Sequence, residues 1–184
     1  MRIGSSQIQM LQKFRRLEDF LVFLSYINTF SVIYKEIMAY SGRYKPKNIK
    51  KYEGNVSSIK YRSLWERQVM RWLDSNPSVI GWNSEEVVVR YRCKTDGKIH
   101  RYFTDLFIRM KDGKCFLIEI KPKNQTVPPK QSSRKTQKYL REVMTYAKNI
   151  SKWEAATEFA NRNGMTFQIW NEDTIKGLGI KLLK

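Results

Sequence analysis

Residues 100–123, HRYFTDLFIRMKDGKCFLIEIKPK, decide the expected fold of this chain. Two apolar runs of strand length, residues 100–110 and 115–121, are separated by Lys111-Asp112-Gly113, which is a turn signal. The stretch therefore predicts an antiparallel hairpin. A further strand, expected over residues 86–92 and joined by a short turn that contains glycine, extends the hairpin to a three-stranded antiparallel meander.

The hairpin carries charged side chains inside strands that are otherwise apolar. Asp105 lies between apolar residues of the first strand, and Glu119 and Lys121 interrupt the second. Because Glu119 and Lys121 are two residues apart, they share one face of a strand. Burial of charged groups that serve no purpose would cost too much free energy, so these three residues are candidates for a functional site.

The turn decides whether Asp105 lies on that same face, because a shift of one residue in the pairing inverts every side chain. A two-residue turn at Asp112-Gly113 would place Asp105 opposite Ile120, on the wrong face. A three-residue loop with Gly113 in the left-handed conformation instead places Asp105 directly opposite Glu119. We favour the three-residue loop.

The residue types in this pattern indicate metal-dependent hydrolysis of a phosphodiester. Two carboxylates about 5 Å apart repel each other, and a divalent cation between them would relieve the repulsion. Oxygen ligands from Asp105, Glu119 and the carbonyl of Ile120 suit Mg²⁺, with Mn²⁺ as the alternative. The ammonium of Lys121 can orient the attacking water and offset the charge that develops on the phosphate. His100 is the single histidine of the chain, so triads and zinc hydrolase sites that need two or more histidines are excluded.

The overall charge indicates a polyanionic partner. The 184 residues include 35 Lys and Arg against 17 Asp and Glu, a formal net charge of +18. Double-stranded DNA is the leading candidate, because basic residues beside phosphates release condensed counterions; an anionic membrane surface is second. Cys93 and Cys115 are too few for a disulfide framework and show no metal-ligand spacing, which favours a reducing compartment.

Three segments are expected along the chain. Residues 1–37 form an N-terminal extension whose apolar part, residues 20–34, is too short to span a membrane and predicts an amphipathic or buried helix. Residues 38–62 predict an extended basic arm, with a solvated linker that contacts nothing as the alternative. Residues 63–184 are expected to hold the catalytic domain. The arm supplies the first expected DNA contacts: Arg43, Lys45 and Lys47.

Helical periodicity surrounds the strands. An apolar stripe at Trp65, Val69, Trp72 and Leu73 predicts a helix from residue 63 to the breaker at residues 74–77. After a loop rich in Pro and Lys, one helix is expected around residues 136–147, and a second over residues 151–164, opened by a capping box at Ser151 and Glu154. A last strand over residues 165–171 would join the sheet in parallel. The expected fold is α/β, a mixed sheet flanked by helices.

These residues carry a resemblance. Asp105 and Glu119-Ile120-Lys121, after a helix that bears Glu66, resemble the PD-(D/E)xK nuclease superfamily, although Thr104 stands where its motif has proline. Five blocks resemble, more specifically, the head completion nuclease family of T-even-type phages and, more distantly, the TnsA endonuclease of transposons, from about residue 38 to 129: SGRYKPKN, YRSLWE, MRWLD, DGKIHRYFTD and FLIEIKPK.

The resemblance implies a restriction-endonuclease-like fold and a Mg²⁺-dependent DNA endonuclease. In the family pattern Asp105 and Glu119 would hold the metal, Lys121 would serve catalysis, and Glu66 would be the helix-borne acid that reaches the metal or its water. It also implies a role in finishing packaged phage heads, in the host cytoplasm or the virion, with head or portal proteins as partners and no membrane.

Several alternatives stay open at this stage. Ser63 and Glu66 also fit a capping box, in which Glu66 only closes the helix start. Basic residues after the catalytic strand can line a DNA groove or form a solvated face: Lys123, Lys130, Arg134, Lys135 and Lys138. The protein could instead be a non-catalytic DNA-binding or virion structural protein, or a nuclease of branched DNA or transposon ends. The sequence predicts no oligomeric state.

Overall fold

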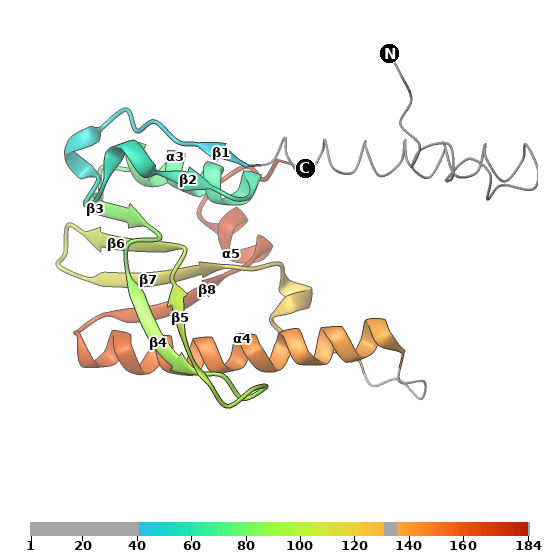
Figure 1. Ribbon diagram of the computed structural model, residues 1–184. Helices are drawn as coiled ribbons and strands as arrows, with labels where there is room; N and C mark the ends of the chain where they lie inside the picture. Colours follow the sequence, from blue (N-terminus) through green and yellow to red (C-terminus); the bar gives the residue numbers. More distant parts are fainter. Residues whose placement is uncertain (1–40, 131–135, 184) are drawn as a thin grey trace, which may run out of the picture. The chain divides into compact units, whose positions relative to one another are not determined.

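A computed structural model describes residues 41–130 and 136–183, and it shows a mixed α/β fold (Figure 1). Its central sheet has the strand order β3-β6-β7-β8, in which β7 and β8 pair in parallel and the other pairs are antiparallel. The strands are β3 (Val79–Ser84), β6 (Leu106–Met110), β7 (Cys115–Ile120) and β8 (Thr166–Trp170). The expected mixed sheet flanked by helices is thus confirmed; the helices are α3 (Leu64–Ser75), α4 (Gln137–Arg162) and α5 (Glu172–Gly177).

The three-stranded meander is wrong. The expected strand over residues 100–110 is broken at Thr104-Asp105, so that β5 (Ile99–Phe103) pairs with β4 (Val88–Arg92) in a separate two-stranded sheet while β6 enters the central sheet. The outer partner of β6 is β3, which the sequence did not predict. Its sequence, VIGWNS, contains glycine, asparagine and serine, residues that disfavour strands, and tertiary pairing overrides that preference.

The expected register of the hairpin between β6 and β7 is confirmed. Gly113 has φ +84°, and its N–H donates to the carbonyl of Met110 at 3.0 Å, as a three-residue loop requires. The ladder pairs Leu106 with Ile118. The same register places Asp105, one residue before β6, opposite Glu119.

Helix α3 begins and packs as expected. The Ser63 hydroxyl accepts from the Glu66 N–H, and the buried face presents Val69, Met70 and Leu73 to the main core. At its other end Asp74 is buried, and its carboxylate accepts from the backbone N–H groups of Lys47 and Asn48 at 2.7 and 2.9 Å. These two hydrogen bonds to a buried carboxylate hold the segment around residues 47–48 against the end of α3.

Residues 42–61 therefore do not form the extended arm that the sequence predicted. The two-residue strands β1 (Gly42–Arg43) and β2 (Lys60–Tyr61) pair, with the short 3₁₀ helices η1 (Ile49–Lys51) and η2 (Val56–Ser58) between them. Tyr52 and Ile59 are buried in the main core, where the Tyr52 ring meets the Trp82 ring edge-on at 4.8 Å. The alternation of Lys with aromatic residues in this segment reflects one exposed and one packed side.

The two helices expected after the catalytic strand are one 26-residue helix, α4. Its true N-cap is Thr136, whose hydroxyl accepts from the Tyr139 N–H at 3.2 Å. Ser151, expected to begin a second helix, lies inside α4, where its hydroxyl donates to the Ala147 carbonyl and accepts from the Lys94 N–H. No glycine or proline separates residues 147 and 151, so nothing interrupts the helix. Leu140 and Val143 of α4 are exposed on the described surface.

A smaller core lies between α4 and the β4–β5 ribbon. Val89, Tyr91 and Tyr102 of the ribbon pack with Ala156 of α4. The ribbon is thereby held beside the central sheet, as Figure 1 shows. Tyr102 faces inward, toward the strand that carries Glu119.

The expected extension over residues 1–37 lies outside the described residues, as do Arg134 and Lys135. Within residues 41–130 and 136–183, no helix combines the length and apolarity needed to cross a membrane.

Candidate active site

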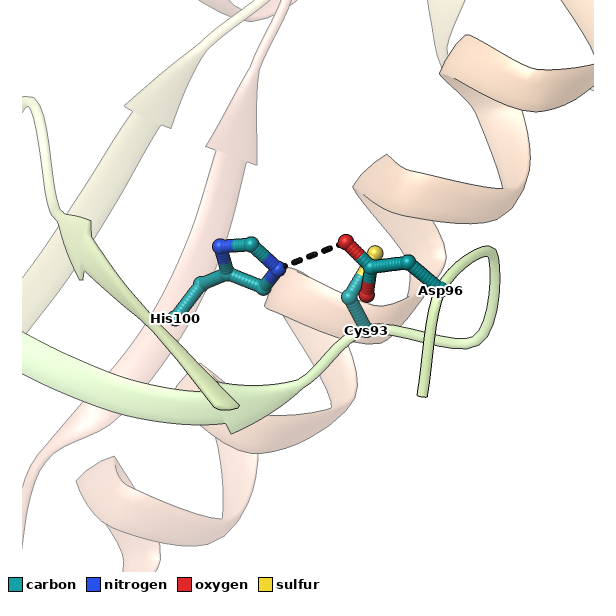
Figure 2. Close-up of side chains that lie close together, drawn as sticks. All are labelled: Cys93, Asp96 and His100. Atoms are coloured by element: carbon teal, nitrogen blue, oxygen red, sulfur yellow. Dashed lines mark hydrogen bonds and ion pairs between the residues drawn. The ribbon is translucent and has the colours of Figure 1, made fainter. Parts of the chain in front are cut away.

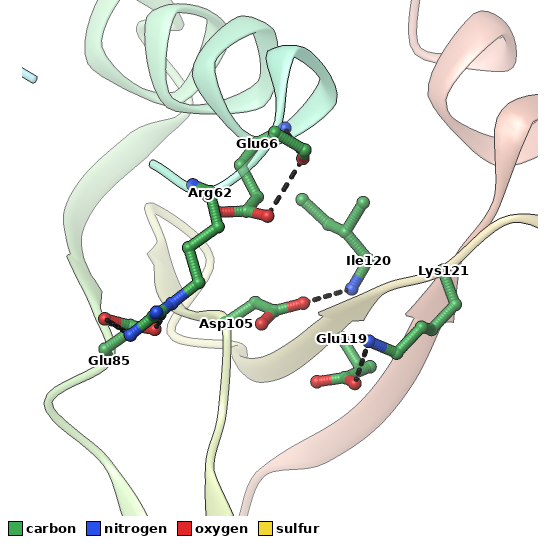
Figure 3. Close-up of polar contacts among 8 residues, drawn as sticks. Arg62, Glu66, Glu85, Asp105, Glu119, Ile120 and Lys121 are labelled. Atoms are coloured by element: carbon green, nitrogen blue, oxygen red, sulfur yellow. Dashed lines mark hydrogen bonds and ion pairs between the residues drawn. The ribbon is translucent and has the colours of Figure 1, made fainter. Parts of the chain in front are cut away.

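The predicted site residues meet where β7 ends and β6 begins (Figure 3). Asp105 immediately precedes β6, Glu119 lies near the end of β7, and Lys121 follows that strand by one residue. Figure 3 shows the Asp105 and Glu119 carboxyls and the Lys121 ammonium pointing toward one another. The expectation that these three side chains share one side of the sheet is met.

Asp105 is held by two neighbouring segments. Its Oδ2 accepts from the backbone N–H of Ile120 at 2.7 Å, and its own carbonyl accepts from the Glu85 N–H at 3.3 Å. Burial raises the pKa of Asp105 well above its ordinary value, and the nearby Glu119 carboxylate raises it further. The Ile120 N–H and the Lys121 ammonium oppose this change in pKa without cancelling it. The site therefore favours a cation close to Asp105.

Glu119 is 2% exposed and has two polar partners. Its Oε2 accepts from the Tyr102 hydroxyl at 2.6 Å, and its Oε1 lies 3.1 Å from the Lys121 Nζ. Burial alone would lower the pKa of Lys121, but the carboxylates of Glu119 and Asp105 leave that pKa raised. The lysine is therefore an ammonium beside two acids.

Glu66 performs the capping function that was the alternative to a metal role. Its Oε1 accepts from the Ser63 hydroxyl at 2.9 Å and its Oε2 from the Arg62 N–H at 2.7 Å. Burial raises its pKa, and the charge of Lys121 acts against that increase, so its carboxyl lies within the field of the site. Within the described part of the chain, however, Asp105, Glu119 and Glu66 do not all approach within 4.8 Å of one another.

Three residues with contacts at the site were not predicted as members of it. Tyr102 belongs to the ribbon and not to the central sheet, so only the fold brings it to Glu119. Arg62 grips Glu85 through two hydrogen bonds of 2.6 and 3.1 Å. Glu85 has φ +57°, the one non-glycine residue with positive φ in the described chain. For Tyr102 the sequence offers one signal, its position three residues before Asp105.

The expected DNA contacts lie at separate places on the described surface. Arg43, Lys45, Lys47, Lys130 and Lys138 are exposed. Lys123 is exposed too, but its ammonium pairs with Asp173 of α5 at 2.7 Å. This ion pair leaves Lys123 less available to a phosphate than the others.

The donor set suits a hard divalent cation. The carboxylates of Asp105 and Glu119 repel each other, which helps to raise the pKa of Asp105, and a cation between them would relieve this repulsion. Their oxygen atoms are the donors that Mg²⁺ prefers. The Ile120 N–H is taken by Asp105. The Ile120 carbonyl remains a predicted ligand.

Comparison with known proteins places the chain in a class of DNA-cleaving enzymes. The family model described as "TnsA-like endonuclease N terminal" matches residues 76–172, which include Asp105, Glu119 and Lys121. The chain therefore belongs to the TnsA-like endonuclease family, as the sequence motifs predicted. The chain is also 43% identical over 148 residues to the head completion nuclease of Enterobacteria phage T4, a match that covers 78% of this chain and 99% of the relative. No solved structure matches the chain at a significant level.

Proposed function

We propose that this protein is a Mg²⁺-dependent DNA endonuclease that acts in phage head completion after DNA packaging. The observation that carries the proposal is the convergence of Asp105, Glu119 and Lys121 at one end of β7, with Lys121 3.1 Å from Glu119. Membership of an endonuclease family and 43% identity to a head completion nuclease support it.

Each side chain has a proposed role that follows from its position. Asp105 and Glu119, with the Ile120 carbonyl, would hold the cation, and Tyr102 keeps the Glu119 carboxylate in place. When bound, Mg²⁺ lowers the pKa of a bound water and neutralises phosphate oxygens. The Lys121 ammonium orients the attacking water and offsets charge that develops on the phosphate. Glu66 would accept a hydrogen bond from a water at the edge of the site.

The charge of the protein supports a DNA substrate bound mainly through its backbone. The net charge of +18 favours polyanions, and contacts to phosphates carry no sequence information. We therefore propose cleavage of double-stranded DNA with little sequence preference. The exposed basic residues named above are the proposed phosphate contacts.

Cleavage of supercoiled and linear plasmid tests the chemistry. The protein should nick or cut DNA with Mg²⁺ or Mn²⁺ and should be inactive with EDTA, and Asp105→Asn and Lys121→Ala should lose activity. Matched controls lie on the same hairpin, at the exposed Asp112–Lys114 ion pair. Asp112→Asn removes one negative charge, as Asp105→Asn does, and Lys114→Ala removes one positive charge, as Lys121→Ala does. Both control variants should retain full activity.

Other outcomes would select a different function. Gel retardation without cleavage, under every metal condition, would favour a DNA-binding or structural protein. Strong preference for a four-way junction over duplex would favour a nuclease of branched DNA. The stage of action is tested by infection with a phage in which the only gene for this protein encodes Lys121→Ala. Heads that are filled with DNA but fail to mature would support action after packaging. Empty heads would contradict it.

A further inference from the structure

A second cluster of metal-binding side chains lies at the tip of the β4–β5 ribbon (Figure 2). Cys93 follows β4, Asp96 lies in the turn, and His100 is the second residue of β5. Their donor atoms all lie within 4.8 Å of one another. The spacing of the cysteines in the sequence gave no signal for this cluster, which the fold brings together.

The hairpin turn produces this convergence. Cys93 and Lys98 are joined by a backbone hydrogen bond of 2.9 Å, and the Gly97 N–H donates to the Cys93 carbonyl at 2.8 Å. Gly97, with φ +70°, allows the chain to reverse in this short space. Asp96 and His100 thus come to lie on the same side of the turn as the Cys93 thiol.

Each donor group has a close polar neighbour. The Asp96 carboxylate accepts from the Lys98 N–H through its Oδ1 at 3.0 Å. Its Oδ2 already lies 2.8 Å from the His100 Nε2. The Cys93 Sγ lies 3.0 Å from the Thr95 hydroxyl and is shielded from solvent, since Cys93 is buried.

We propose that Cys93, Asp96 and His100 form a structural site for Zn²⁺. A thiolate, a carboxylate and a neutral imidazole are all common zinc ligands, and water would complete a tetrahedron. Two negative ligands neutralise the ion, which lessens the repulsion expected in a strongly basic protein. A tetrahedral ion holds such donors about 3.5 Å apart, so Asp96 Oδ2 and His100 Nε2, now 2.8 Å apart, would separate to admit the ion, and rotation of these two half-exposed side chains allows this change.

The softness of the ligands separates this site from the one at Asp105 and Glu119. Thiolate and imidazole select Zn²⁺ or Co²⁺, whereas oxygen-only sites suit Mg²⁺. A bound ion would fasten the tip of the ribbon, whose Lys94 contacts α4 through Ser151 and Glu154. The ribbon carries Tyr102, so its rigidity bears on the Glu119 carboxylate.

Cobalt binding tests the site directly. The full chain, stripped of metal with EDTA and freed of the chelator, is titrated with Co²⁺ and followed by absorption. A one-to-one complex with a thiolate-to-cobalt charge-transfer band and tetrahedral visible bands is expected, and Zn²⁺ should abolish both. Zn²⁺ should also raise the thermal midpoint of unfolding, because it binds only the folded state.

Variants assign the ligands. His100→Gln and Asp96→Asn change partly exposed side chains, so they should fold normally and weaken Co²⁺ binding strongly. Cys115→Ser should leave the spectrum unchanged, and Asp105→Asn should do so as well because it lies in the other site. Absence of the charge-transfer band, or its retention in His100→Gln, would overturn the proposal.

Discussion

The Tyr102 hydroxyl donates a 2.6 Å hydrogen bond to the carboxylate of Glu119, and this contact joins the β4–β5 ribbon to the central sheet. Tyr102 lies on the β4–β5 ribbon and Glu119 on the central sheet. Burial raises the pKa of Tyr102, and the negative charge of Glu119 raises it further, so the phenol remains a donor at every physiological pH. The buried Glu119 carboxylate is thereby oriented by a neutral hydroxyl. Because this hydroxyl carries no charge, it leaves the negative charge of Glu119 available to a bound cation.

Tyr102→Phe should weaken the proposed Mg²⁺ site without removing a ligand. The substitution keeps the ring in the small core and leaves Glu119 short of one donor, which costs about 1.5–3 kcal/mol for a charged buried acceptor. We expect a lower free energy of unfolding without metal and a reduced kcat for DNA cleavage. Both are measured by urea unfolding and steady-state kinetics.

Tyr91→Phe is the matched control for Tyr102→Phe. Tyr91 lies on the neighbouring strand in the same small core, and its ring packs edge-on against Tyr102 at 6.5 Å. Its loss of a hydroxyl should leave cleavage unchanged. Equal loss of kcat in both variants would show that general weakening of the core, and not the orientation of Glu119, is responsible.

The raised pKa of Asp105 predicts how the stability of the metal-free protein depends on pH. The folded state holds the Asp105 proton more tightly than the unfolded chain, whose carboxyl titrates near pH ~4. The contribution of Asp105 to the free energy of unfolding is therefore highest below that pH and decreases as pH rises through the raised folded pKa. Asp105→Asn removes this dependence, so its stability relative to the parent should increase as pH rises.

Urea unfolding in EDTA from pH 4 to pH 8 measures this difference. Asp112→Asn is the control, since the Lys114 side chain and its N–H lower the pKa of Asp112, so that its contribution to stability changes only below pH ~4 and the difference between this variant and the parent should stay constant from pH 4 to pH 8. A constant difference between Asp105→Asn and the parent across this range would contradict the burial of an ionisable Asp105.

Glu85 has a strained backbone conformation and is hydrogen-bonded to the backbone of Asp105. Its φ of +57° is a left-handed conformation that glycine adopts more easily, and its N–H donates to the Asp105 carbonyl. Glu85→Gly and Glu85→Ala both remove the ion pair with Arg62, so the difference between them reports the backbone alone. Glu85→Ala should be less stable than Glu85→Gly by about 1 kcal/mol in urea unfolding. Equal stabilities would show that residue 85 is not held in this conformation in solution.

The active-site hairpin could be predicted because its geometry is local. Gly113 and the length of the turn fix the register, and that register decides on which face Asp105 lies. The partner strand β3 could not be predicted in the same way, since it pairs with β6 across more than twenty residues of sequence and contains Gly81. The contact of Tyr102 with Glu119 was missed for a different reason: the chain breaks at Thr104-Asp105, so that Tyr102 belongs to the separate β4–β5 ribbon, and the sequence predicted one continuous strand there.

The capping pattern at residues 151–154 shows the limit of local motifs. Ser151 and Glu154 have the spacing of a helix start, but both make their contacts with Lys94 on the ribbon. The same pair of residue types is therefore used in the middle of α4 for tertiary contact. At Ser63 and Glu66, where a short strand precedes the helix, the pattern did mark a true beginning.

Ser151→Ala tests this interpretation of α4. The buried Ser151 hydroxyl accepts from the Lys94 N–H at 3.1 Å, so its removal leaves a backbone donor unpaired and should cost about 1–3 kcal/mol in stability. Glu154→Gln breaks only an exposed ion pair with Lys94 and should cost at most about 1 kcal/mol. Urea unfolding compares the two, and a larger effect of Glu154→Gln would favour a capping role instead.

The basic residues near β1 predict how DNA binding responds to salt. Arg43, Lys45 and Lys47 are exposed, and the segment that carries them is fastened to α3 through Asp74. Phosphate contacts from a segment held in place should each contribute about 0.9 to the slope of log K against log salt concentration. Replacement of all three by Ala should therefore reduce the magnitude of that slope by up to about 3 for duplex DNA, measured by fluorescence anisotropy in EDTA.

The control is Lys114→Ala, which changes an exposed lysine at the turn of the β6–β7 hairpin and should leave the slope unchanged. An unaltered slope in the triple variant would place the DNA on another face of the protein.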